Sequence, residues 1–220
     1  MAAWNVRTLL DRSNTDRPER RTALVAKELQ KYRIDIAALS ETRFADEGSL
    51  KEEGGGYTFF WKGKPQNEDR IHGVGFAIKT SLLRIIPTLP TGINERLIKL
   101  RIPLSKSRHL TIISAYAPTL TSPDDVKGQF YDELDNLIKS TPKNDKLVIL
   151  GDFNARVGRD HSNWEGVLGS HGIGKVNDNG LLLLSNCSEH KLCITNTMFR
   201  MADKYKTTWM HPRSKSLASD

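Results

Sequence analysis

The sequence predicts an α/β fold built from mixed β-sheets and amphipathic helices. Residues 34–39 are apolar on both faces, which is typical of a strand that is covered on both sides. Segments near residues 18–32 and 124–140 instead space their apolar side chains by three and four, as amphipathic helices do. Residues 96–102 alternate between apolar and polar, and residues 110–116 offer a matching strand, so we expect an antiparallel pair.

The first elements along the chain are a short strand and a helix. Residues 2–6 predict the end of a strand, with Asn5 on the opposite face from Trp4 and Val6. Pro18 suits the first turn of the helix, because no hydrogen bond is needed from a backbone N–H there. We expect this helix to reach about Tyr32, with an apolar stripe formed by Thr22, Val25, Leu29 and Tyr32.

The middle of the chain predicts further strands and a second helix. The segment at residues 44–56 is acidic and ends in three glycines, so we expect a surface loop. Residues 57–61 and 73–78 predict strands. Ser-Pro-Asp-Asp at residues 122–125 predicts a capped helix start with acidic groups at its positive end. The stripe of this helix consists of Val126, Phe130, Leu134, Leu137 and Ile138.

The last third of the chain begins with a predicted buried strand at residues 147–150, which ends at a glycine. Beyond it we expect a glycine-rich loop at residues 158–175 and a helix at residues 181–190. Two extended segments follow, at residues 192–195 and 206–210. The sequence has no internal repeat, linker or low-complexity tract. We therefore expect a single domain over residues 1–220.

The charge balance favours a polyanionic partner. Lys and Arg number 33 against 26 Asp and Glu, which gives a net charge of +7 and a pI of about 9.4. Such a surface attracts nucleic acid, although a basic surface with no such partner has the same composition.

The cysteines and the hydropathy pattern exclude several classes of protein. Cys187 and Cys193 are too few for a disulfide framework or a zinc site, so we expect buried, reduced thiols and no disulfide-linked partner. No segment approaches the ~18 apolar residues of a membrane span, and the first residues lack the pattern of a signal peptide. We expect a soluble protein of the nucleus or cytoplasm that is not secreted and has no membrane partner.

Asp152 and Asn154 follow the predicted strand at residues 147–150 and are two positions apart. Since alternate residues of a strand face the same way, we expect both side chains to face one pocket. A carboxylate and an amide together suit a hard divalent cation and a phosphate. A glycine followed by Asp and Asn is equally typical of an ordinary strand-ending turn.

Polar side chains stand at the ends of other predicted strands as well: Asn5, Glu41 and Tyr116. Each has an ordinary structural explanation, as a turn residue, a solvated charge and a core aromatic with its hydroxyl at the surface. Their contexts are W-N-V-R-T-L, L-S-E-T-R and S-A-Y-A-P-T, followed by L-G-D-F-N-A. In this order the four motifs closely resemble the endonuclease/exonuclease/phosphatase superfamily.

Within that superfamily the chain is most similar to the apurinic-type endonuclease domain of non-long-terminal-repeat retrotransposons and to host proteins derived from them. The later segments N-D-N-G-L-L-L-L, I-T-N-T-M-F and T-T-W-M-H-P-R-S fit this subgroup. The resemblance implies a four-layer sandwich in which two mixed β-sheets pack face to face between outer helices. It also implies a Mg²⁺-dependent DNA endonuclease, with Mn²⁺ as an alternative cation.

The resemblance further implies a role for each site residue. Glu41, Asn5 and Asp152 hold the metal, and Asp152 also positions or deprotonates the attacking water. Asn154 holds a phosphate oxygen, and Tyr116 supports the transition state. Arg7 and Trp209 join Asn154 in contacting the substrate.

The sequence departs from the family pattern in three places. Arg7 stands where many relatives have an acidic or amide residue, and the first strand is short. The family continues into an Asp-Tyr strand and a Ser-Asp-His motif, whereas this sequence stops at Ser219-Asp220. None of its histidines stands in that context: His72, His109, His161, His171, His190 and His211. We therefore expect a domain truncated at both ends, with its last strands missing and its cleavage impaired.

Two other functions fit the same sequence. One is a non-catalytic remnant that binds nucleic acid through its charge. The other keeps the superfamily and changes the substrate to a phosphoinositide or a sphingolipid, against which the glycine-rich loop and the D-N-G and T-W segments argue. The sequence assigns neither an oligomeric state nor a preference for a target sequence or an abasic site.

Overall fold

The computed structural model describes residues 1–11, 20–206, 209–210 and 217–218. The chain divides into two compact units. The first contains Met1–Tyr116 and Thr141–Asp152, and the second contains Ala117–Ser140 and Phe153–Asp220. Pro18, His211 and Ser219-Asp220, which entered the sequence-based predictions, lie outside the described residues.

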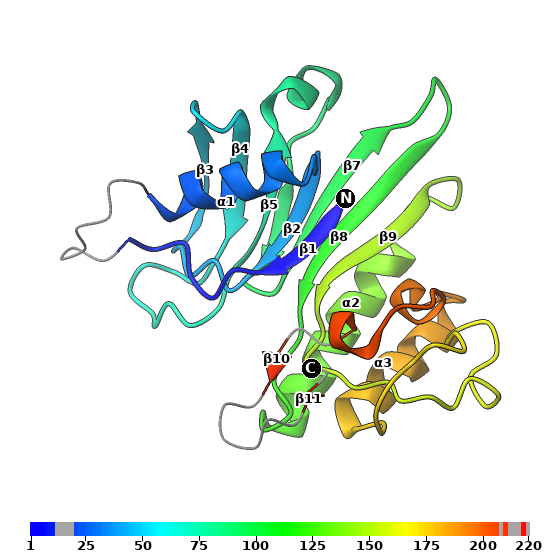
Figure 1. The fold of residues 1–220 in the computed structure, drawn as a ribbon. Helices are drawn as coiled ribbons and strands as arrows, with labels where there is room; N and C mark the ends of the chain where they lie inside the picture. Colours follow the sequence, from blue (N-terminus) through cyan, green and yellow to red (C-terminus); the bar gives the residue numbers. More distant parts are fainter. Residues whose placement is uncertain (12–19, 207–208, 211–216, 219–220) are drawn as a thin grey trace. The chain divides into compact units, whose positions relative to one another are not determined.

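A five-stranded mixed sheet forms one half of the first unit (Figure 1). Its strands are β1 (Ala2–Asn5), β2 (Ile36–Ser40), β3 (Glu47–Glu52), β4 (Tyr57–Lys62) and β5 (Val74–Lys79). They lie in the order β1-β2-β5-β4-β3. β1 runs parallel to β2, and the other neighbours are antiparallel.

A four-stranded mixed sheet forms the other half of this unit. Its strands are β6 (Thr91–Asn94), β7 (Leu97–Pro103), β8 (His109–Tyr116) and β9 (Lys146–Asp152), in sequential order. The predicted antiparallel pair is confirmed as β7 and β8, whereas β8 and β9 run parallel. Between β5 and β6 lies a short 3₁₀ helix, η1 (Thr80–Ile85).

The inner faces of the two sheets form one apolar core. Alternate residues of β2 and β5 contribute Ile36, Ala38, Phe76 and Ile78, and the facing strands contribute Ile98, Leu100 and Ile112. All of them are at most 4% exposed. This arrangement confirms the predicted α/β fold with two mixed sheets packed face to face.

Helix α1 (Arg21–Lys31) covers the outer face of the five-stranded sheet, as Figure 1 shows. Its Val25, Ala26 and Leu29 pack against Ala37, Leu39, Phe59 and Ala77. β2 is therefore buried on both faces, as its uninterrupted apolar sequence predicts. Tyr32 does not continue the buried stripe: the helix ends at Lys31, and Tyr32 is 67% exposed, with the Lys31 ammonium group over its ring.

The second unit contains helices α2 (Asp124–Lys139) and α3 (Asp178–Glu189) and the long loop before α3. α3 begins where the side chain of Asn177 accepts a hydrogen bond from the backbone N–H of Gly180 at 2.8 Å. Val167, Leu168, Leu183, Leu184 and Cys187 form its core. Short elements complete it: η2 (Thr195–Thr197), η3 (Asp203–Tyr205), β10 (Trp209–Met210) and β11 (Leu217–Ala218).

Three predicted segments differ from the structure. Residues 44–56 are not all loop, because β3 pairs with β4 from Glu47 to Glu52. Its polar sequence suits a sheet edge, where main-chain hydrogen bonds rather than buried side chains hold the strand. Residues 192–195 form only an isolated bridge between Ile194 and Leu168 before η2 begins. The strand at 147–150 is half-buried, because β9 lies at the edge of its sheet.

Two further details correct the sequence-based predictions. Pro123 occupies the cap position of α2, so the hydroxyl of Ser122 stands one residue too early to cap the helix and bonds Thr119 instead. The acidic first turn of this helix is confirmed. Cys193 is exposed rather than buried, and both cysteines are free thiols. Over the described part of the chain, no helix is long and apolar enough to cross a membrane.

A buried carboxylate links three neighbouring strands of the four-stranded sheet. The Asp145 carboxylate, which precedes β9, accepts hydrogen bonds from Arg101 Nε at 2.6 Å and Nη2 at 2.9 Å on β7. It also accepts one from the Thr111 hydroxyl on β8 at 2.8 Å. This carboxylate is 2% exposed. The hydrogen bond from Arg101 is the main cause that lowers its pKa from 3.8 to about 2.

We expect Asp145→Asn to destabilise the chain by about 1 kcal/mol at neutral pH, because the partly exposed Arg101 is screened by solvent. A lowered pKa means that the contribution of Asp145 is present above pH 3.8 and is lost as the pH falls toward 2. Urea unfolding of both proteins between pH 7 and pH 2 measures this difference. Asp203→Asn, at an exposed carboxylate paired with Lys206, is the control. A difference that stays constant over this pH range would contradict the prediction.

Candidate active site

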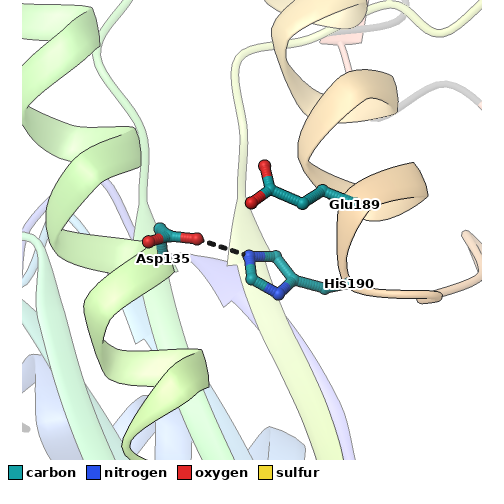
Figure 2. A group of neighbouring side chains, drawn as sticks. All are labelled: Asp135, Glu189 and His190. Carbon is teal, nitrogen blue, oxygen red and sulfur yellow. Dashed lines mark hydrogen bonds and ion pairs between the residues drawn. The ribbon is translucent and has the colours of Figure 1, made fainter.

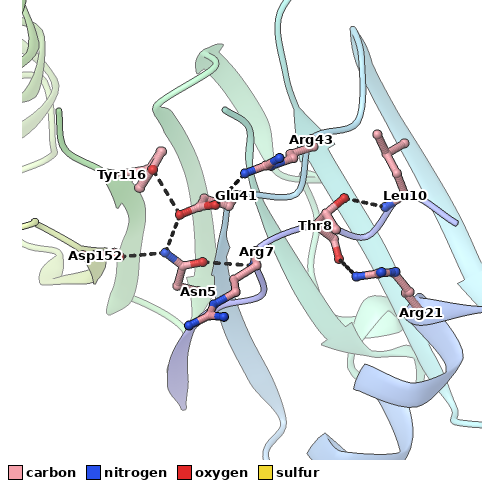
Figure 3. A network of polar contacts seen from close by, with 9 residues as sticks. All are labelled: Asn5, Arg7, Thr8, Leu10, Arg21, Glu41, Arg43, Tyr116 and Asp152. Carbon is pink, nitrogen blue, oxygen red and sulfur yellow. Dashed lines mark hydrogen bonds and ion pairs between the residues drawn. The ribbon is translucent and has the colours of Figure 1, made fainter. Parts of the chain in front are cut away.

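Four of the predicted site residues meet at the strand ends of the first unit (Figure 3). Asn5 donates from Nδ2 to Glu41 Oε1 and to Asp152 Oδ2, each at 2.8 Å. The Tyr116 hydroxyl donates to the same Glu41 oxygen at 3.2 Å. The Asn5 amide therefore links the two carboxylates, and the Tyr116 hydroxyl also binds to one of them, that of Glu41.

Strand direction explains why these residues meet. β1 runs parallel to β2, and the register places Asn5 beside Ser40, the residue before Glu41. β8 runs parallel to β9, and Tyr116 pairs directly with Asp152. The carboxyl ends of both parallel pairs lie at one edge of the packed sheets, so their last side chains converge there.

The backbone around this site is strained. Arg7, Glu41 and Arg43 have φ angles of 60°, 56° and 59°, in the left-handed region that side chains other than glycine rarely adopt. Hydrogen bonds on both sides hold the segment after β2 in place. Arg43 N donates to the carbonyl of His72 at 2.9 Å, and Leu9 N donates to the carbonyl of Thr42 at 2.9 Å. Such strain persists where the surrounding structure enforces it, which is typical of functional sites.

Tyr116 remains protonated at neutral pH. Burial, followed by the nearby Glu41 carboxylate, raises the pKa of its hydroxyl to about 12. The hydroxyl is therefore a donor, in agreement with its hydrogen bond to Glu41.

Arg96 and His72 support Tyr116, and the motifs in the sequence give no sign of either. The Arg96 guanidinium lies 5.5 Å from the centre of the Tyr116 ring and donates from Nη1 to the Tyr116 carbonyl at 3.2 Å. Its Nη2 lies 3.0 Å from His72 Nε2. Since arginine only donates, Nε2 accepts and the His72 proton is on Nδ1. Burial, then Arg96, lowers the pKa of His72 to about 4, so the imidazole is neutral at pH 7.

The residues of this site fit a hard divalent cation. Magnesium and manganese prefer oxygen ligands, mainly carboxylates and amide carbonyls. Because Asn5 Nδ2 contacts Glu41 and Asp152 at once, the two carboxylates lie close enough together to serve one cation. Asn5 Oδ1 accepts from the backbone N–H of Arg7 at 3.0 Å, and the Arg7 side chain is exposed.

The structure does not place Asn154 and Trp209 with these residues. β9 ends at Asp152, and Asn154 has a φ of 47°, so the alternation of the strand does not continue to it. Asn154 belongs to the second unit, where its amide donates to the carbonyl of Ala117 at 2.9 Å. The side chain of Trp209 lies outside the part of the chain that the structure describes. Their roles stay predictions.

A separate ionic cluster joins α2 to α3 in the second unit (Figure 2). His190 Nε2 lies 2.8 Å from Asp135 Oδ1, and Glu189 lies beside them. These three donor groups could hold a metal ion, but Lys139 already places its ammonium 2.7 Å from Asp135 and 3.7 Å from Glu189. Lys139 is the main cause that lowers the pKa of Asp135. We therefore interpret the group as an ion cluster with its own cation.

Comparison with known proteins shows which family this chain belongs to. The chain is 31% identical over 212 residues to craniofacial development protein 2 of Bos taurus, which covers 96% of this chain and 33% of that protein. The same protein of Tragulus javanicus is 30% identical, with 96% and 34% covered. The chain thus spans about a third of the length of these curated relatives.

The fold also matches a solved structure. The crystal structure of an AP endonuclease from Leishmania major superposes with a TM-score of 0.51 and 15% identity, over 86% of this chain and 65% of that one. At this identity the likeness concerns the fold alone. The model of the endonuclease/exonuclease/phosphatase family matches residues 2–204. The chain therefore belongs to the endonuclease/exonuclease/phosphatase family.

Proposed function

We propose that this chain is a divalent-metal-dependent phosphodiester hydrolase that cleaves DNA, of the type found in non-long-terminal-repeat retrotransposons. The observation that carries the proposal is the Asn5 amide that links Glu41 and Asp152, with Tyr116 on the shared carboxylate. Hydrolysis of a phosphodiester needs positive charge at the phosphate and an oriented water molecule. This cluster supplies groups suited to both tasks.

Each residue has a distinct task in this proposal. Glu41, Asp152 and Asn5 would hold Mg²⁺ or Mn²⁺, which stabilises negative charge that develops on the phosphate. The Asp152 carboxylate orients the attacking water and accepts its proton. Tyr116 keeps its proton, so it donates a hydrogen bond to the charge that grows during the reaction. Asn154 donates to a phosphate oxygen, and Arg7 and Trp209 contact the nucleic acid.

Charge and motif order support DNA as the substrate. The net charge of +7 favours binding to a polyanion, and this binding is expected to weaken as salt rises. The four strand-end motifs resemble those of the retrotransposon endonucleases in their order. The family match extends over parts of both units, which supports one functional domain. The proposal includes an intracellular location, in the nucleus or cytoplasm.

The metal site can be tested without catalysis. We expect Mn²⁺ to bind to the chain, and Glu41→Gln to weaken this binding by about tenfold or more, because a charged ligand is lost. Isothermal titration calorimetry of both proteins measures the affinities. Glu53→Gln, at a carboxylate whose side chain is 80% exposed, is the matched control and should bind as the unaltered chain does. Identical isotherms for Glu41→Gln and the unaltered chain would remove Glu41 from the site.

Catalysis is tested by nicking of supercoiled plasmid in Mg²⁺. We expect residues 1–220 to nick slowly, because they do not contain the Ser-Asp-His motif to which the resemblance gives phosphate binding, and one such donor is worth about 10²–10³ in rate. Asp152→Asn preserves the shape of the side chain and should abolish the activity. Asp160→Asn, at an exposed carboxylate of the second unit, should leave it unchanged.

The outcomes of this assay separate the candidate functions. Nicking that disappears only in Asp152→Asn supports the hydrolase. Salt-sensitive DNA binding with no nicking by any of the three proteins would favour the non-catalytic alternative.

A further inference from the structure

The two oxygens of the Glu41 carboxylate have different partners (Figure 3). Oε1 accepts hydrogen bonds from two neutral groups, the Asn5 amide and the Tyr116 hydroxyl. Oε2 instead lies 3.2 Å from Nη2 of Arg43, two residues further along the chain, and the guanidinium of Arg43 is positively charged. Glu41 thus already has a cation at the oxygen on its other side.

This ion pair is incomplete. Arg43 contacts Glu41 through Nη2, and its Nε is buried with no hydrogen-bond partner among the described residues. A second arginine–carboxylate pair of this unit differs, because Arg101 uses Nε and Nη2 to reach both oxygens of Asp145. Two-pronged pairing is the stronger geometry for a guanidinium. The single contact between Arg43 and Glu41 is therefore the weaker of the two pairs and the easier one to break.

Position and exposure allow Arg43 to take a second anion. Its side chain is 41% exposed, whereas that of Glu41 is 18% exposed. A guanidinium binds phosphate oxygens with the same planar geometry that it uses for carboxylates. A divalent cation at Glu41 would repel Arg43 and leave it to bind another anion.

We propose that Arg43 is a placeholder cation: it neutralises Glu41 when no divalent cation is bound, and it binds a phosphate of the nucleic acid when a divalent cation neutralises Glu41 instead. This inference rests on the proposed metal site. It adds a substrate-binding residue whose contribution depends on the metal. The competing explanation is structural, in which Arg43 only holds Glu41 in position.

The two explanations predict opposite changes in metal affinity. If Arg43 competes with the cation, Arg43→Met should bind Mn²⁺ about fivefold more tightly, the factor that an ion pair of this exposure is worth. If Arg43 holds Glu41 in position, the same variant should bind Mn²⁺ more weakly. Calorimetric titration with Mn²⁺ alone distinguishes them. Arg108→Met, at an exposed arginine of the same unit, controls for the change in net charge and should bind as the unaltered chain does.

A DNA-binding measurement tests the second half of the proposal. A fluorescent DNA duplex is titrated with the chain, Arg43→Met and Arg43→Lys, in saturating Mn²⁺ and in chelator. In Mn²⁺ we expect Arg43→Met to bind about fivefold more weakly, with Arg43→Lys in between because it keeps the charge and loses the planar fork. In chelator the three proteins should bind alike, since Arg43 is then engaged by Glu41. Circular dichroism melting checks that the variants are folded.

The results separate this proposal from the proposed function. Weaker Mn²⁺ binding by Arg43→Met, or a loss of DNA affinity that is equal with and without Mn²⁺, overturns the role of Arg43 and leaves the metal site standing. Absence of Mn²⁺ binding by the unaltered chain overturns both.

Discussion

Burial of two sheet faces against each other is the constraint on which the candidate site depends. Since side chains alternate along a strand, the register that places Ile36 and Ala38 in the inter-sheet core also determines where the strand delivers Glu41. The same holds for Ile112 on β8 and for Tyr116 at its end. A slip of one residue in either sheet would exchange its buried and outer faces. The apolar core therefore positions the polar site, and Tyr116, whose ring belongs to that core, carries its hydroxyl to Glu41.

Burial of the core also offsets the free-energy cost of the strained backbone at the site. Three residues in the left-handed region, Arg7, Glu41 and Arg43, cost about 1–2 kcal/mol each. A fully buried isoleucine or phenylalanine such as Ile112 or Phe76 contributes about 1.5–3 kcal/mol. Two or three such side chains are enough to offset the strain, and the inter-sheet core contains many more. The strained segment thus keeps its conformation because the packed core holds the strands on which it depends.

Two arginine–carboxylate pairs in one unit illustrate how geometry separates a structural role from a proposed functional one. Arg101 and Asp145 form a two-pronged pair that also includes Thr111, and it ties together β7, β8 and the start of β9. Arg43 and Glu41 form a single contact on a strained turn, and Arg43 Nε is buried without a partner among the described residues. The residue types are similar in the two cases. What differs is whether the surroundings saturate the pair, and an unsaturated ion pair beside other polar groups is suited to exchange partners.

The sequence by itself determined the elements whose burial repeats at short range, namely α1, α2, α3 and strands such as β2, β7 and β8, and it identified Asn5, Glu41, Tyr116 and Asp152 through their strand-end motifs. Only the tertiary structure decided that Asn5 joins Glu41 and Asp152, which are 36 and 147 positions away. It also decided that β3 is a strand, that Arg96 and His72 support Tyr116, and that Asp135 meets His190. The physical reason is that periodicity records which face of a local element is buried. Hydrogen bonds between distant side chains, and edge strands held by main-chain pairing, leave no such periodic trace and form only when the sheets and helices have packed.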